Sequence, residues 1–144
     1  MVPSEIAAAI PHRPPFLFLD EIVERSDDRI VCRKTFHGDE FFYQGHYPGY
    51  PLTPGVILCE AAMQAGAVLL AQRIGGVPGV PVATRMGDVR FKRTVLPGET
   101  IDIEVDLVER LADAFYLKAK VSCGGKVAVR FEFACTLARI ADGA

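Results

Sequence analysis

Glu60 is the residue whose position most clearly indicates chemistry. It lies in an apolar run from Val56 to Ala71 in which the only other polar side chain is Gln64. Burying a carboxylate is costly unless the group is paired, protonated or functional. Gln64, one helical turn later, can donate a hydrogen bond that orients the carboxyl group. A buried glutamate with a purely structural role is the alternative interpretation.

His46 is the second candidate, and it lies in a segment that cannot be helical. Glycines and a proline surround it in Gln44-Gly45-His46-Tyr47-Pro48-Gly49. Such a loop can hold an imidazole ring in one place, and histidine takes up and returns protons near neutral pH. The alternative is an ordinary surface histidine.

The third candidate is the backbone amide of Gly55. Thr53 and Pro54 are typical of a helix start, with Thr53 as the N-cap and Pro54 at the first helical position. The free N–H groups there lie at the positive end of the helix dipole. Because Gly55 has no side chain to obstruct a substrate carbonyl, its amide could polarise that carbonyl. An ordinary helix cap explains the same residues.

The elements that must position these groups begin with one long helix, expected from Pro54 to about Ile74. Gly75-Gly76 supplies a stop. Since the segment is apolar on nearly all sides, we expect protein to enclose it. The Gly- and Pro-rich residues 75–81 are expected to form a mobile loop.

Alternating apolar and polar residues predict strands on both sides of this helix. They are expected at 16–23, 30–36, 89–92, 101–107, 115–122 and 127–133. Gly124-Gly125 is typical of a hairpin turn, and the last four strands predict an antiparallel meander. The simplest arrangement is an α+β fold in which five or six antiparallel strands wrap around one long central helix.

Composition and charge narrow the classes of function. The chain has 144 residues, half of them apolar, which suits one compact domain over 1–144. No apolar stretch approaches the roughly 18 residues needed to cross a bilayer, so a cytoplasmic protein is expected. The four cysteines show no metal or redox spacing, and a net charge of −2 argues against nucleic acid as a partner. No metal or other cofactor is expected.

Four separated motifs resemble one known family. They are Ile10-Pro11-His12-Arg13-Pro14-Pro15-Phe16, Phe42-Tyr43-Gln44-Gly45-His46-Tyr47-Pro48-Gly49, Pro54-Gly55-Val56-Ile57-Leu58-Cys59-Glu60-Ala61-Ala62-Met63-Gln64 and Arg90-Phe91-Lys92-Arg93-Thr94-Val95-Leu96-Pro97-Gly98. In this order they resemble the hot-dog-fold 3-hydroxyacyl-acyl-carrier-protein dehydratases of bacterial fatty acid synthesis. The resemblance covers most of the chain.

The resemblance implies a catalytic histidine at His46, a catalytic glutamate at Glu60 and an oxyanion-binding amide at Gly55. It also implies a homodimer in which His46 faces the partner subunit's Glu60, and dimers of this family often associate into hexamers. Glutamate rather than aspartate at position 60 is similar to the branch that does not isomerise its product. Departures from the usual pattern occur at Phe41, Tyr47, Tyr50 and residues 87–89.

The expected reaction is an elimination of water from a 3-hydroxyacyl thioester. His46 removes a proton from C2 while the Gly55 amide stabilises the thioester oxygen. Glu60, kept protonated by burial, assists departure of the C3 hydroxyl group.

Further residues are expected to serve binding. Gln64 orients Glu60, and the acyl tunnel beside the helix is lined by Val56, Met63 and Phe42. The carrier protein is usually acidic, so a local positive patch would receive it. Its candidates are Arg85, Arg90, Lys92 and Arg93. A solvated strand face with ordinary surface charges is the alternative interpretation.

Two other functions fit part of the pattern. A hot-dog thioesterase would use the helix carboxylate to activate water, but it has no need of the His46 loop. A non-catalytic acyl-binding or regulatory domain has no need of His46, Glu60 and Gly55 together. The sequence leaves open the length of the acyl chain and whether the thioester is carried by carrier protein or by coenzyme A. It also leaves open whether the pathway makes bulk fatty acids, lipid A or a specialised product.

Overall fold

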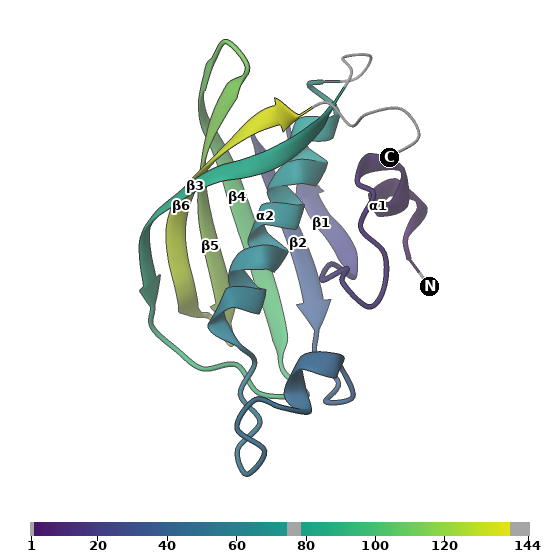
Figure 1. Cartoon of the computed structure of the whole chain (residues 1–144), viewed down its shortest axis with the longest axis vertical. Helices are drawn as coiled ribbons and strands as arrows, with labels where there is room; N and C mark the ends of the chain where they lie inside the picture. The colour runs from purple at the N-terminus through teal and green to yellow at the C-terminus, as the bar shows by residue number, and fades with distance from the viewer. Residues whose placement is uncertain (1, 75–78, 139–144) are drawn as a thin grey trace.

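A six-stranded antiparallel sheet lies against one long helix (Figure 1). The computed structural model describes residues 2–74 and 79–138. Its elements are α1 (Ser4–Ala9), β1 (Glu21–Arg25), β2 (Arg29–Thr35), the 3-10 turn η1 (Phe41–Tyr43), α2 (Gly55–Ala71), β3 (Val80–Phe91), β4 (Thr100–Leu111), β5 (Ala114–Cys123) and β6 (Lys126–Ala138). The strand order is β1-β2-β4-β5-β6-β3. The expected α+β arrangement with five or six strands is confirmed.

The core lies between α2 and the sheet. Leu58, Leu69 and Leu70 of the helix are at most 2% exposed, and Ile103 and Phe131 face them from the strands. These positions follow the helical and strand periods that the sequence shows. Burial of such apolar side chains stabilises the fold by about 1.5–3 kcal/mol each, which fixes the helix axis over the sheet.

The start of α2 differs from the expectation. Its first helical residue is Gly55, and Pro54 is the N-cap without any side-chain cap bond, so the predicted Thr53 cap is wrong. The Thr53 hydroxyl instead bonds the Tyr43 hydroxyl at 2.5 Å, and both side chains are buried. A tertiary partner therefore takes the oxygen that a local cap would use. The predicted stop at Gly75-Gly76 lies outside the described residues.

One side of α2 is not covered in this chain. Val56 is 70% exposed, and Glu60 and Met63 are half-buried. These positions are three or four residues apart, so they form one stripe along the helix. The described residues of one chain cover the other sides of the helix and leave this stripe exposed. The stripe carries the candidate carboxyl group.

The strand predictions hold with two changes. Of the predicted segment 16–23, only residues 21–23 lie in a strand, β1, which continues to Arg25. The backbone of Phe16 and Phe18 bonds the side chain of Gln64 rather than a neighbouring strand. β3 is longer than predicted and takes up residues 80 and 81 of the expected loop. It pairs with β6, at the opposite edge from β1, so the predicted meander is correct for β4, β5 and β6 only.

The β5–β6 turn forms at the predicted glycines. Gly124 and Gly125 have φ of 60° and 79°, the left-handed region that a tight two-residue turn requires and that glycine adopts without strain. The turn pairs Cys123 with Lys126 and sets the register of the two strands behind α2.

We predict that Gly66→Val lowers the free energy of unfolding by about 1–3 kcal/mol through overpacking. A Cβ at Gly66 would lie 2.8 Å from Cζ of Phe133 and 3.4 Å from Cδ2 of Leu117, two buried side chains. The gain in helix propensity, roughly 0.3 kcal/mol, is too small to offset this. Denaturant unfolding at fixed protein concentration measures the change.

Gly49→Val is the matched control, because nothing lies within 4 Å of a Cβ built at Gly49. Equal stability of the two variants would show that α2 can move away from the sheet at no cost.

Candidate active site

His46 lies in a loop that is held by hydrogen bonds between its own residues. Its Nδ1 lies 3.0 Å from the carbonyl oxygen of Leu52, and the amide of Tyr50 donates to the carbonyl of Tyr47 at 2.8 Å. A carbonyl oxygen can only accept, so Nδ1 carries the hydrogen and Nε2 keeps a free lone pair. Figure 1 shows this segment, between η1 and α2, projecting past the end of the sheet. The imidazole is thus presented with its basic nitrogen available.

Tyr47 fixes the direction of the His46 ring. The two rings are edge to face, with centroids 4.7 Å apart. Tyr47 has φ of 51°, a left-handed conformation that costs a bulky residue about 1–3 kcal/mol. The loop is anchored where the amide of Thr53 donates to the carbonyl of Val95 at 2.8 Å. The chain therefore maintains a strained backbone beside the candidate base.

The start of α2 presents unpaired amides. Ile57 N–H donates to the carbonyl of Pro54 at 2.9 Å, whereas Gly55 and Val56 N–H have no acceptor in the described part of the chain. A Cβ at Gly55 would lie 2.5 Å from the Phe91 ring, so a glycine is what fits between that ring and the helix. These amides lie at the positive end of the helix dipole and suit a developing oxyanion.

Glu60 is oriented as the sequence predicts. The amide of Gln64 donates to Glu60 Oε2 at 3.0 Å, and Gln64 itself is 1% exposed. Gln64 also accepts from Phe18 N–H at 2.8 Å and donates to the Phe16 carbonyl at 2.9 Å. The Glu60 side chain is 25% exposed, less buried than expected. One carboxyl oxygen is thus held from inside the protein while the group remains accessible.

Glu60 opens into a cavity of about 210 Å³ beside α2. Met63, Ala67 and Cys135 line it, whereas Val56 and Phe42, the other two residues expected beside the acyl group, do not. Val56 faces solvent, and Phe42 packs against Phe36 and Tyr43 in an aromatic cluster. His12 also lines the cavity, and the sequence analysis did not name it as a site residue. No local pattern places it there, because its contact with α2 spans the intervening strands.

His46 is not part of the Glu60 cavity. No hydrogen bond or ion pair joins His46 and Glu60 within the described residues, and His46 does not line that cavity. One chain therefore presents the candidate base and the candidate acid at separate places.

The four candidate cations near β3 differ in availability. Arg93 bonds Glu99 at 2.8 Å and also the Cys123 carbonyl, and Arg90 bonds Asp88 at 2.9 Å. Arg85 and Lys92 are exposed, with no carboxylate partner in the described part of the chain. These two keep their charge free for an acidic partner.

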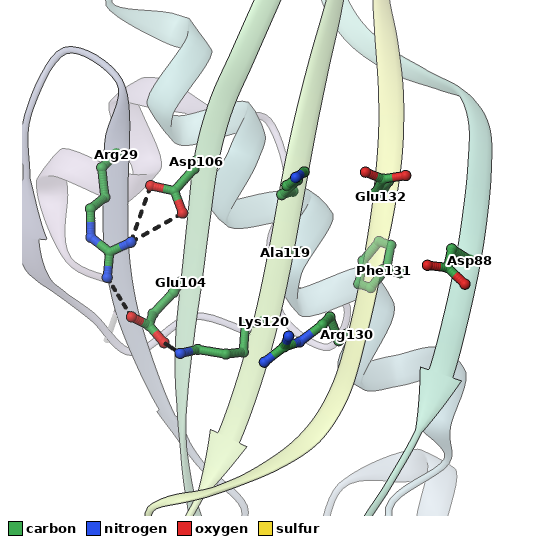
Figure 2. Close-up of a pocket in the computed structure, with 10 residues that line it drawn as sticks. Arg29, Asp88, Glu104, Asp106, Ala119, Lys120, Arg130, Phe131 and Glu132 are labelled. Atoms are coloured by element: carbon green, nitrogen blue, oxygen red, sulfur yellow. Dashed lines mark hydrogen bonds and ion pairs between the residues drawn. The ribbon is translucent and has the colours of Figure 1, made fainter.

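A second hollow lies on the face of the sheet away from α2 (Figure 2). There Arg29 bonds Asp106 and Glu104, and Lys120 bonds Glu104 at 3.0 Å. Burial opposes ionisation of Glu104, but its hydrogen bonds from Lys120 and Arg29 hold its pKa below the ordinary value. None of the predicted catalytic residues lines this hollow. Its centre is an ion-pair network in which Arg29, Glu104, Asp106 and Lys120 are paired with one another.

The described residues contain no group of three or more His, Cys, Asp or Glu side chains arranged to hold a metal ion. None of their helices is long and apolar enough to cross a membrane.

Comparison with known proteins identifies the family. The family model for the FabA-like domain matches residues 10–132. The 3-hydroxyacyl-(acyl-carrier-protein) dehydratase FabZ of Clostridium perfringens (strain SM101 / Type A) is 38% identical, covering 87% of this chain and 90% of that protein. The protein of the same name from Koribacter versatilis (strain Ellin345) is 36% identical over 93% of this chain and 87% of its own length.

A solved structure supports the fold independently. The dehydratase heterocomplex ApeI:P from Xenorhabdus doucetiae contains a chain with a TM-score of 0.79 and 20% identity, over 93% of this chain and 91% of that chain. The hot-dog fold expected from the sequence is therefore confirmed. The match to the FabA-like model over most of the length, with the identities to its relatives, shows that this chain belongs to the FabA-like family.

Proposed function

We propose that the protein is a hydro-lyase that dehydrates (3R)-3-hydroxyacyl-acyl-carrier-protein to the trans-2-enoyl form, in fatty acid or lipid A related biosynthesis. The observation that carries the proposal is the Glu60 carboxyl group, held by buried Gln64 at an apolar cavity in a chain of this family. The proposal takes residues 1–144 as one catalytic domain and includes a cytoplasmic location.

His46 acts as the base. Its Nδ1–H is held by the Leu52 carbonyl, which leaves Nε2 to accept the proton from C2 of the substrate. The free amide of Gly55 donates to the thioester oxygen, which gains negative charge as the C2–H bond breaks.

Glu60 acts as the acid. It donates its proton to the C3 hydroxyl group, the C3–O bond breaks, and water leaves as the C2–C3 double bond forms. His46 has then gained one proton and Glu60 has lost one, so a proton returning from the imidazolium to the carboxylate resets the site. Acid and base can coexist at one pH because their surroundings differ.

The complete site takes residues from two subunits. Separation of His46 from the Glu60 cavity in one chain supports an arrangement in which His46 faces the partner subunit's Glu60. β3 is an edge strand, and its apolar residues Val82, Met86 and Val89 are exposed. A second copy of the chain can pair with such an edge and cover these apolar side chains. We include a trimer of dimers as a further level of assembly.

The acyl group lies along α2 beside Met63, and the carrier protein docks on the exposed cations in β3 and directly after it. Arg85 and Lys92 have the free charge for an acidic surface, which raises the rate of encounter more than the final affinity.

We expect His46→Ala and Glu60→Gln each to lower enoyl formation by roughly 10²- to 10⁴-fold, the usual contribution of one acid or base. The assay follows the conjugated enoyl product and free thiol together, from a medium-chain (3R)-3-hydroxyacyl thioester. His37→Ala, at an exposed histidine, is the control and should retain full activity.

The same assay separates the rival functions. Free thiol without enoyl product would identify a thioesterase, and tight acyl binding without either product would identify a binding domain.

We further expect activity to return when the inactive His46→Ala and Glu60→Gln chains are co-expressed. A mixed dimer then has one site with His46 from one chain and an intact Glu60 from the other. A purified mixed dimer should therefore have about half of the wild-type activity, and the unfractionated mixture from random pairing about a quarter. Recovery is measured in purified mixed dimers carrying two different tags, and mixed dimers as inactive as the parents would place both residues of each site in one chain.

A further inference from the structure

His12 and Glu60 face each other across the cavity beside α2. His12 Nε2 lies 3.9 Å from Glu60 Oε2, and their side chains are 31% and 25% exposed. Both line the cavity of about 210 Å³ that also contains Met63 and Cys135. This imidazole has no part in the mechanism above, yet among the described residues it is the basic side chain within 4.0 Å of the Glu60 carboxyl group.

The segment that carries His12 is held firmly on both sides. The guanidinium group of Arg13 donates to the carbonyls of Ala7, Ile10 and His12 at 2.6–2.8 Å. A few residues later, Gln64 bonds the backbone of Phe16 and Phe18. The glutamine that orients Glu60 therefore also holds the N-terminal segment that places His12 beside Glu60.

The buried nitrogen of His12 determines where its proton lies. Nδ1 is inaccessible to solvent and has no hydrogen-bond partner in the described part of the chain. An imidazolium would bury an unsatisfied charged N–H there, and the other neutral tautomer would bury an unsatisfied N–H, each at a cost of about 1–3 kcal/mol or more. The neutral ring with its hydrogen on Nε2 buries no N–H group, leaves Nδ1 as an unpaired acceptor, and directs a donor toward Glu60.

Two hydrogen-bond donors then point toward the same carboxyl oxygen of Glu60. Gln64 Nε2 donates to Glu60 Oε2 at 3.0 Å and His12 Nε2–H faces it, while Oε1 has no partner among the described residues. A hydroxyl hydrogen on Oε2 would point at these donors, so the acidic proton belongs on Oε1. A spacing of 3.9 Å is long for a hydrogen bond, and such bonds commonly shorten when substrate binds and charge develops.

We propose that His12 is a positioning residue for the acid of the reaction. With Gln64 it keeps Oε2 as the acceptor oxygen, leaves Oε1 to deliver the proton, and stabilises the carboxylate that forms. This role rests on the dehydratase function proposed above.

The other groups around the Glu60 carboxyl are not charged. Burial raises the pKa of Cys135 to about 11, so its thiol is neutral in the working range of pH. Glu60 and His12 are the only acidic or basic side chains that line the cavity in the described chain. Arg13 is engaged by backbone carbonyls, and the remaining titratable group expected to approach is His46 of the partner subunit.

The experiment compares His12→Leu, which removes the donor, with His12→Gln, whose amide nitrogen can replace Nε2–H. We expect His12→Leu to lower kcat by roughly 10- to 100-fold with little change in KM, a part of the full effect of one acid. The alkaline limb of its kcat/KM profile, where Glu60 loses the proton, should move to higher pH because the carboxylate loses a donor. His12→Gln should restore most of kcat and the wild-type limb.

His37→Leu is the matched control, because His37 is exposed and its recorded bonds use only its backbone N–H. It should leave kcat, KM and the pH profile unchanged. A folded His12→Leu enzyme with an unmoved alkaline limb, or a loss confined to KM, would overturn the proposal.

A direct measurement keeps the role of His12 separate from the dehydratase function. The ¹³C carboxyl resonance of Glu60, assigned with Glu60→Gln, is titrated in the wild-type and His12→Gln proteins and in His12→Leu where it folds. Loss of the donor should raise the titration midpoint, and glutamine should restore it. Identical midpoints in the wild type and His12→Leu would reject the role of His12, even in an active enzyme. If His12→Leu does not fold, a midpoint in His12→Gln above the wild-type value would reject it instead. Absence of enoyl product from the wild type would instead reject the function.

Discussion

The hydrogen bonds of Gln64 connect the fold to the candidate chemistry. Its amide is buried, and it uses its oxygen for Phe18 and its nitrogen for Phe16 and Glu60. An amide desolvated without these partners would cost several kcal/mol, so helix, N-terminal segment and carboxyl group must be placed together. Residues 16–18 are not part of any strand for the same reason. One side chain thus decides both a strand boundary and the orientation of an acid.

The features that could be predicted from sequence are those with a short period. Glu60 and Gln64 are four residues apart on a helix, so their contact follows from helical geometry alone, and the strands follow from alternation. The Thr53 cap could not be excluded locally, because its hydroxyl is taken by Tyr43 through folding of the loop between them. His12 could not be placed beside Glu60, because nothing local encodes a contact between the N-terminal segment and the middle of the chain.

The uncovered stripe on α2 shows that the apolar composition of the helix does not reflect burial within one chain alone. An all-apolar helix predicts enclosure by protein, yet Val56 is largely exposed in the single chain. An apolar composition indicates that a helix is buried in the assembled protein. It does not indicate whether the same chain or a partner chain buries it. The same ambiguity applies to β3, an edge strand on which apolar Val82, Met86 and Val89 are exposed in the single chain.

That edge strand also bears on misassembly. A long, regular and apolar edge would accept almost any extended chain and lead to aggregation. β3 is not regular: its register with β6 shifts between Ala83 and Arg85 and again between Gly87 and Arg90, and Asp88 adopts a left-handed φ of 50°. These interruptions limit hydrogen bonding to strands with matching irregularities. A nascent or partly unfolded neighbour cannot present them, so the shape of β3 favours a folded partner over an aggregate.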